Sequence, residues 1–83
     1  MSLESLISAK KKTVGTKQTL KALEKGQARK VFIATDADRF VTEPVYELCR
    51  KKGVPIVEVS SMKELGQACG IEVNCATASI IEE

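Results

Sequence analysis

One stretch near the N-terminus organises the predicted fold: Val14-Gly15-Thr16-Lys17-Gln18-Thr19-Leu20-Lys21. Gly15 permits a sharp change of direction, Thr16 can cap the free amides of a first helical turn, and leucines follow at helical spacing until Gly26. We therefore expect a helix that begins in this stretch and ends near Gly26.

The first turn of this helix is a candidate binding site because of three side chains. Lys17 and Lys21 are cationic, and Gln18 carries an amide. A helix N-terminus also presents unpaired N–H donors with a partial positive charge. Such a tip suits a partner that is anionic or rich in hydrogen-bond acceptors.

The middle of the chain predicts a strand, a helix and a second strand. Residues 31–35 (VFIAT) form a run of β-formers without polar alternation, which indicates a strand buried on both faces. A helix is expected over residues 42–52, with Thr42 as its cap and Pro44 in its first turn, and a strand over residues 54–59. Because this is a βαβ pattern, the two strands should be parallel.

The remaining segments complete a layered domain. Ser61 and Glu64 have the spacing of a capping box, which predicts a helix up to Gly70, and residues 76–81 read as the last strand. A short first helix should carry the lysines of residues 10–12 at its C-terminal end. We expect one domain, residues 1–83, folded as a three-layer α-β-α sandwich with a central sheet of about four strands.

Composition limits the function classes. The 83 residues include no histidine, which removes the usual general base and the Ser/His and Cys/His nucleophile pairs. Cys49, Cys69 and Cys75 lack metal-binding spacing, so we expect buried reduced thiols and neither a zinc site nor a disulfide framework. The N-terminus lacks a signal-peptide pattern and no apolar run is long enough for a membrane span, so a cytoplasmic location is expected.

Charge is distributed unevenly along the chain. Residues 1–30 carry a net charge of +6 and residues 31–83 carry −4, although the whole chain is only +2. A one-sided distribution favours a basic face for nucleic acid. A solvated lysine-rich surface that binds nothing explains the same charge.

Two further features allow alternative interpretations. Asp36 and Asp38 follow a buried strand, where two carboxylates can hold Mg²⁺ for phosphotransfer, but we favour a role in the loop or at a helix entry for at least one of them. Ile71 and Val73 flank Glu72 in a predicted loop, where they form either an apolar binding edge or an inward-facing contact.

Three motifs carry a resemblance to a known family. They are GTKQTLKALEKG at residues 15–26, IATDAD at residues 33–38 and LGQACGIEV at residues 65–73. In this order and spacing they resemble the ribosomal protein L7Ae family of kink-turn RNA-binding proteins, especially its small bacterial members. The resemblance implies an α-β-α sandwich that has no enzymatic activity, needs no cofactor or metal and binds sharply bent RNA.

The resemblance also implies which residues contact the RNA. The helix start would dock against tandem sheared G·A pairs, which assigns Gly15, Thr16, Lys17, Gln18 and Lys21. The acidic residue that meets a flipped-out nucleotide falls on Asp38. The loop that encloses the extruded base corresponds to Ile71, Glu72, Val73 and Asn74.

The sequence departs from the family pattern at a few of these positions. Lys17 and Gln18 stand where Asn and Glu are common, and lysine donates hydrogen bonds but cannot accept them. Arg39 stands where a proline is usual, and Asn74 where a proline is frequent.

The sequence therefore predicts a cytoplasmic, monomeric, non-catalytic RNA-binding protein. Its expected partner is a kink-turn in ribosomal or regulatory RNA, with the ribosome as a candidate assembly and no membrane partner. Two alternatives stay open: a protein-interaction module of the same fold that does not bind RNA, and a small Mg²⁺-dependent phosphotransfer enzyme that uses Asp36 and Asp38.

Overall fold

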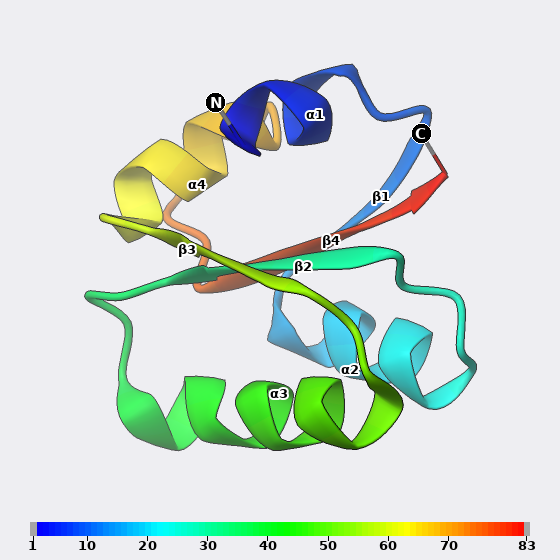
Figure 1. The fold of residues 1–83 in the computed structure, drawn as a ribbon. Coiled ribbons are helices and arrows are strands. Elements are labelled where there is room, and N and C mark those ends of the chain that lie inside the picture. Colours follow the sequence, from blue (N-terminus) through cyan, green and yellow to red (C-terminus); the bar gives the residue numbers. More distant parts are fainter. Residues whose placement is uncertain (1, 83) are drawn as a thin grey trace.

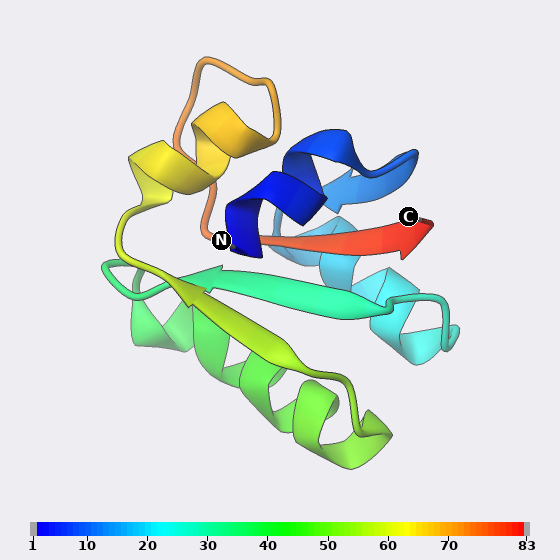
Figure 2. The same ribbon diagram turned by 45° about the horizontal axis from the view of Figure 1, so that its top comes forward.

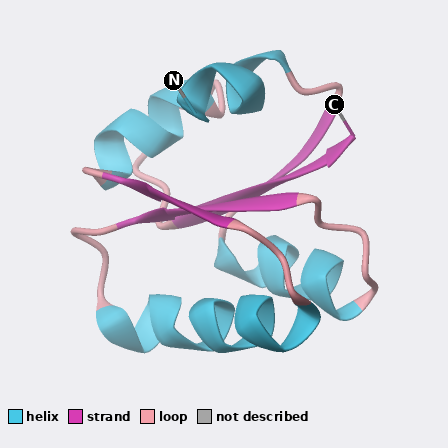
Figure 3. Ribbon diagram, in the orientation of Figure 1, coloured by secondary structure: helices cyan, strands magenta, loops and turns pink. Residues whose placement is uncertain are grey.

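The computed structural model describes residues 2–82 of the chain. Its elements are α1 (Ser2–Ser8), β1 (Lys11–Val14), α2 (Thr16–Glu24), β2 (Lys30–Ala34), α3 (Arg39–Lys52), β3 (Ile56–Val59), α4 (Met62–Ala68) and β4 (Thr77–Glu82). Figure 1 shows the sheet as a central layer, with α1 and α4 on one face and α2 and α3 on the other. The three-layer α-β-α sandwich predicted from the sequence is confirmed, as the colouring of Figure 3 also shows.

The last strand of the chain lies inside the sheet. The strand order is β1-β4-β2-β3, and β4 pairs antiparallel with both β1 and β2. The β2 and β3 strands are parallel, as the βαβ pattern predicted. Because of this arrangement, the C-terminal ends of β1, β2 and β3 and the N-terminal end of β4 all lie at one edge of the sheet.

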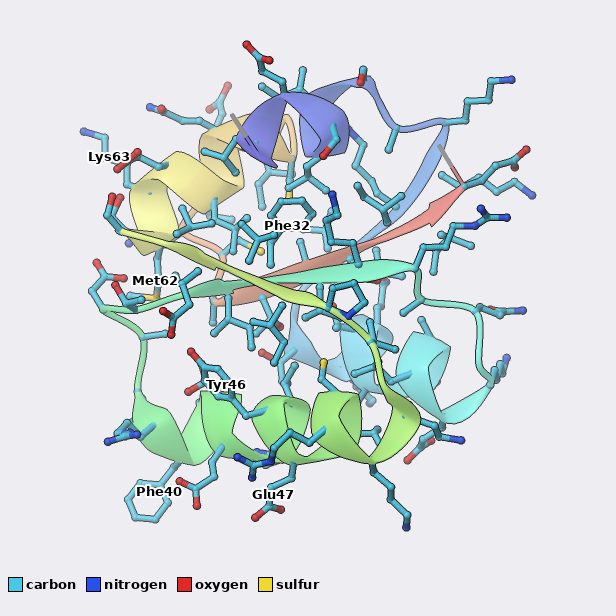
Figure 4. The ribbon with its side chains drawn as sticks, in the orientation of Figure 1. Phe32, Phe40, Tyr46, Glu47, Met62 and Lys63 are labelled. Atoms are coloured by element: carbon cyan, nitrogen blue, oxygen red, sulfur yellow. The ribbon has the colours of Figure 1, made fainter. Side chains whose placement is uncertain are left out.

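The β2 strand separates two apolar clusters. Phe32 and Ala34 pack with residues of α1 and α4 on one face, whereas Val31 and Ile33 pack with residues of α2 and α3 on the other. Figure 4 shows the Phe32 side chain between the sheet and α1. Burial on both faces explains why this strand shows no polar alternation.

Helix α3 begins earlier than the sequence predicted. Asp38 is the N-cap residue and its carboxylate accepts a hydrogen bond from the Phe40 N–H at 2.9 Å. Thr42, the predicted cap, is instead a buried residue inside the helix, and Pro44 lies in the second turn. The predicted start was wrong because Asp38, four residues before Thr42, is an equally favoured N-cap residue.

Helix α2 also begins without the predicted cap. Gly15 is the N-cap residue, with φ 100° and ψ 157°, and no side chain caps the helix there. This backbone conformation is essentially restricted to glycine. Thr16 lies inside the helix, and its hydroxyl accepts a hydrogen bond from the Thr77 hydroxyl at 3.0 Å.

The lysines of residues 10–12 do not extend the first helix, which ends at Ser8. Lys11 and Lys12 belong to β1. The Lys12 ammonium nevertheless donates to the carbonyl oxygens of Leu6 and Ile7, at 3.0 and 3.3 Å. The predicted pairing of a lysine with the negative end of this helix therefore occurs, but from a neighbouring strand.

No helix between residues 2 and 82 has both the length and the apolar content that a membrane-spanning helix requires.

Replacing Ser61 by alanine should destabilise the fold. The Ser61 hydroxyl accepts a hydrogen bond from the Glu64 N–H at 3.1 Å and caps α4, as predicted. We expect the free energy of unfolding, measured by urea denaturation, to fall by about 1 kcal/mol. Ser60→Ala is the matched control, because the Ser60 hydroxyl donates to the exposed Glu64 carboxylate and caps no backbone N–H, and its loss should cost less than about 0.5 kcal/mol. Equal losses in both variants would contradict the assigned cap.

Candidate nucleic-acid interface

One edge of the sheet brings together segments that are far apart in sequence. The Gly15 N–H donates to the Thr77 carbonyl at 2.9 Å, which joins the start of α2 to the start of β4. The Ala34 N–H donates to the Ala76 carbonyl at 2.9 Å, and the Thr35 N–H to the Val59 carbonyl at 2.8 Å. The start of α2, the end of β2 and the start of β4 are therefore linked at this edge, and Figures 1 and 2 show the loop before β4 leading from the end of α4 to this strand.

Buried hydroxyl groups fix the helix tip to the sheet. The Thr13 hydroxyl lies 3.0 Å from that of Thr19 and 2.6 Å from that of Ser79, and Thr19 and Ser79 are fully buried. The Thr77 to Thr16 bond adds a second link between α2 and β4. Because buried hydroxyls are costly unless paired, this network holds α2 in one orientation on β1 and β4.

The polar side chains of the helix tip face solvent. Lys17, Gln18 and Lys21 are exposed, whereas Gly15 and Thr16 are half-buried against the sheet. Gln18 and Lys21 also line a groove of about 220 Å³ with Lys25 farther along the helix. The predicted donor-rich tip is therefore accessible, and its cationic character continues along the exposed side of α2.

The loop of residues 71–74 is held against α4. The Ile71 N–H donates to the Gly66 carbonyl at 3.1 Å, and the Cys75 N–H donates to the Met62 carbonyl at 3.1 Å. A Cβ atom at Gly66 would overlap the carbonyl oxygen of Val73, so only glycine permits this close approach. The loop thus has a defined position beside the helix.

Ile71 and Val73, which the sequence predicted to form either an apolar binding edge or an inward-facing contact, differ in exposure. Ile71 is half-buried and packs against the apolar cluster beneath α1 and α4, whereas Val73 is 68% exposed. The loop and α4 line a hollow of about 350 Å³, to which Lys63 and Gln67 also contribute. Sequence reasoning did not assign Lys63 and Gln67 to the site. Their spacing of four residues, which places them on one exposed face of a helix just before the loop, could have indicated it.

The two aspartates after β2 each hold the start of a helix. Asp38 caps α3, and an oxygen of the Asp36 carboxylate accepts a hydrogen bond from the Met62 N–H at 2.8 Å at the start of α4. These contacts give both carboxylates a structural role. Among residues 2–82, no group of three or more His, Cys, Asp or Glu residues is arranged to hold a metal ion.

Phe40 lies outside the assembled edge although it follows Asp38 closely. Its side chain is 91% exposed and extends away from the body of the molecule below α3, as Figure 4 shows. Sequence reasoning gave it no role. It lines a shallow hollow with Arg39, Pro44 and the acidic residues Glu43 and Glu47.

The fold and the assembled edge define a small α/β domain with a donor-rich helix tip joined to β4 and an exposed loop that leads into the same strand. Residues 2–83 match the model of the ribosomal protein L7Ae/L30e/S12e/Gadd45 family. The chain belongs to this family.

Several relatives match over almost their full length. A protein from Geobacillus sp. (strain WCH70) that is named an RNA-binding protein is 46% identical over 81 residues, which are 98% of this chain and 99% of the relative. The RNA-binding protein YbxF of Geobacillus stearothermophilus is 43% identical over the same shares of both chains. The solved structure of the Giardia lamblia 15.5kD RNA binding protein superposes with a TM-score of 0.86 and 33% identity, and covers 98% of this chain and 68% of that one.

Replacing Gly66 by alanine should disturb the loop. The added methyl group must displace the backbone at Val73, and overpacking of this kind costs about 1–3 kcal/mol in the free energy of unfolding. Urea denaturation measures the change. Gln67→Ala is the control, because Gln67 is exposed on the same helix and its replacement should change stability by less than about 0.5 kcal/mol. A Gly66→Ala variant as stable as the parent protein would show that the loop does not lie so close to α4.

Proposed function

We propose that this protein binds RNA, and that its target is a kink-turn. The observation that carries the proposal is the Gly15 to Thr77 bond, which joins the α2 tip to the start of β4, the strand that the exposed 71–74 loop leads into. The names of its relatives, several of which are called RNA-binding proteins, give independent support. We infer no catalytic activity and no cofactor.

The α2 tip is proposed to read the paired part of the kink. The Gln18 amide can donate and accept at once, which suits the edges of sheared G·A pairs, and Gly15 and Thr16 place the backbone of the first turn close to the RNA. Lys17 and Lys21 are proposed to contact phosphates, which a sharp bend brings together. Lys17 supplies donors only, so the acceptor function in this pair rests on Gln18.

The loop is proposed to hold an unpaired base. RNA-binding proteins recognise splayed-out bases by apolar or aromatic contact and by hydrogen bonds to their edges. Val73 supplies an exposed apolar surface, Ile71 supports it from the core side, and Glu72 and Asn74 supply polar groups beside it. Asp38 has carboxylate lone pairs beyond its bond to Phe40 and can accept from the flipped-out nucleotide.

The proposed action is a population shift. A protein that binds only the bent conformer stabilises it relative to the extended one by RT ln(1 + [L]/Kd), where L is the free protein. This action suits ribosomal or regulatory RNA that must adopt one shape. We propose that the protein acts in the cytoplasm as a monomer.

Binding should depend on the shape of the RNA. A gel-shift comparison uses a kink-turn RNA, a duplex of equal length and the same kink-turn with its G·A pairs replaced. We expect selective retention of the intact kink-turn, and Gln18→Ala should weaken that complex by about threefold to tenfold with little effect on the duplex, because only base-edge contacts distinguish the two RNAs.

The other outcomes of this comparison have distinct meanings. Equal retention of all three RNAs would contradict shape recognition and indicate a general basic surface. Failure to retain any of them would favour a protein-interaction module of the same fold.

Salt dependence should identify the phosphate contacts. Removal of one phosphate contact lowers the slope of log affinity against log salt concentration by roughly 0.7 to 0.9. We expect this change for Lys21→Ala, measured by fluorescence anisotropy with kink-turn RNA at several salt concentrations. Lys51→Ala is the matched control, since Lys51 is an exposed lysine in the last turn of α3, away from the assembled edge. Identical slopes for the two variants would remove Lys21 from the interface.

A further inference from the structure

Two of the three cysteines lie together beneath the loop. Cys69 is half-buried at the C-terminal cap of α4, and Cys75 is 3% exposed just before β4. Cys75 belongs to the apolar cluster beneath α1 and α4 and Cys69 packs against the same cluster, where the two thiols influence each other's ionisation. Cys49 belongs to the apolar cluster on the opposite face of the sheet and contacts neither.

The Cys69–Cys75 pair lies close to both parts of the candidate interface, the 71–74 loop and the start of α2. The two cysteines flank residues 70–74, which include the whole exposed loop. The Cys75 thiol donates to the Thr77 carbonyl at 3.0 Å, and the Gly15 N–H at the start of α2 also faces the Cys75 sulfur. Cys75 therefore touches the loop, the start of β4 and the helix tip.

The environment makes the two thiols chemically different. The hydrogen bond from Cys69 and the nearby Gly15 N–H lower the pKa of Cys75, although burial acts in the opposite direction. The same hydrogen bond, together with burial, raises the pKa of Cys69. The first proton lost by the pair thus leaves a thiolate on Cys75 with a thiol beside it, and a thiolate is the reactive form of cysteine.

We propose that Cys69 and Cys75 are a site of reversible oxidation by hydroperoxides, and that the disulfide they form weakens binding at the adjacent interface. The second half rests on the proposed function. Two thiols that pack in one cluster at the ends of a short loop are placed as a disulfide requires, and a second thiol beside a reactive one is typical of redox-sensitive sites.

The chemistry balances with one molecule of hydrogen peroxide. The Cys75 thiolate attacks one peroxide oxygen, the O–O bond breaks, and the departing hydroxide takes up the proton that Cys75 had released, which gives a sulfenic acid and water. The Cys69 sulfur then attacks the Cys75 sulfur, forms the S–S bond and displaces hydroxide, which leaves as a second water with the Cys69 proton. Two thiols are oxidised and one peroxide is reduced.

The product changes contacts at the interface. A disulfide requires a sulfur separation near ~2.05 Å and has no S–H group, so Cys75 can no longer donate to the Thr77 carbonyl. The ends of the loop are drawn together, and residues 71–74 shift relative to the α2 tip. Because one RNA must contact both parts, a shift of one against the other lowers its affinity.

The oxidation can be tested by peptide mapping of the complete protein. The reduced protein is treated with hydrogen peroxide, denatured, alkylated and digested with trypsin, which places Cys69 and Cys75 in the peptide of residues 64–83 and Cys49 in that of residues 40–50. We expect the first peptide to lose two hydrogen atoms and remain unalkylated, whereas the second is alkylated. Dithiothreitol should reverse the change. Full alkylation of both peptides after peroxide treatment would overturn the proposal.

Variants and RNA binding complete the test. Cys49→Ala should still form the disulfide, whereas Cys75→Ala should leave Cys69 alkylated. Mapping of the parent protein decides the oxidation step even if a variant fails to fold.

The oxidised protein should bind the kink-turn RNA at least about fivefold more weakly than the reduced protein, a typical coupling between two linked sites. Equal affinity of the two forms would overturn the proposed regulation.

The two proposals fail in distinguishable ways. If the reduced protein does not bind kink-turn RNA, the proposed function is wrong, and the oxidation site is judged on the peptide masses alone. If the reduced protein binds and no disulfide forms, the proposed function stands and the oxidation site does not.

Discussion

The central position of β4 is the constraint on which the rest of the structure depends. This strand is the last in the chain, yet it pairs antiparallel with both β1 and β2. Its N-terminal end therefore lies beside the C-terminal ends of strands as distant in sequence as β1, which ends at Val14, whereas β4 begins at Thr77. The loop before β4 is brought to the α2 tip by this pairing, with the Gly15 to Thr77 bond as the direct link. A different strand order would separate the two parts of the candidate interface.

Local patterns in the sequence were sufficient to predict most elements. The apolar run of β2, the parallel βαβ unit and the Ser61 cap of α4 all depend on residues close together in sequence, and all are confirmed. The helix starts that were wrong share one cause. Asp38, for which the sequence predicted a role in the loop or at a helix entry, and Gly15, which was assigned to a sharp turn, are the N-cap residues. The threonines chosen as caps face the core or the sheet instead. A capping pattern gives several candidates, and tertiary packing selects among them.

The candidate site was predictable only in part for a related reason. The charge and amide content of the α2 tip can be read from its own residues, and these side chains are exposed as expected. The hydroxyl network cannot be read in this way, because Thr13 and Ser79 are 66 residues apart and meet only through strand pairing. The contrast between half-buried Ile71 and exposed Val73 likewise depends on how the loop packs on Gly66. Residues that hold a site in place are therefore harder to predict than residues that face its partner.

The departure from the family pattern at Arg39 has a local explanation in the helix that follows. Arg39 is the first residue of α3, directly after the Asp38 cap. Proline is favoured at this position because the first N–H of a helix has no acceptor within the helix and the fixed φ of proline suits the first turn. Arginine loses no intrahelical bond there either, so the Asp38 cap and the turn after β2 keep their geometry. Arginine at this position therefore adds a cation directly after Asp38 while the Asp38 cap is kept.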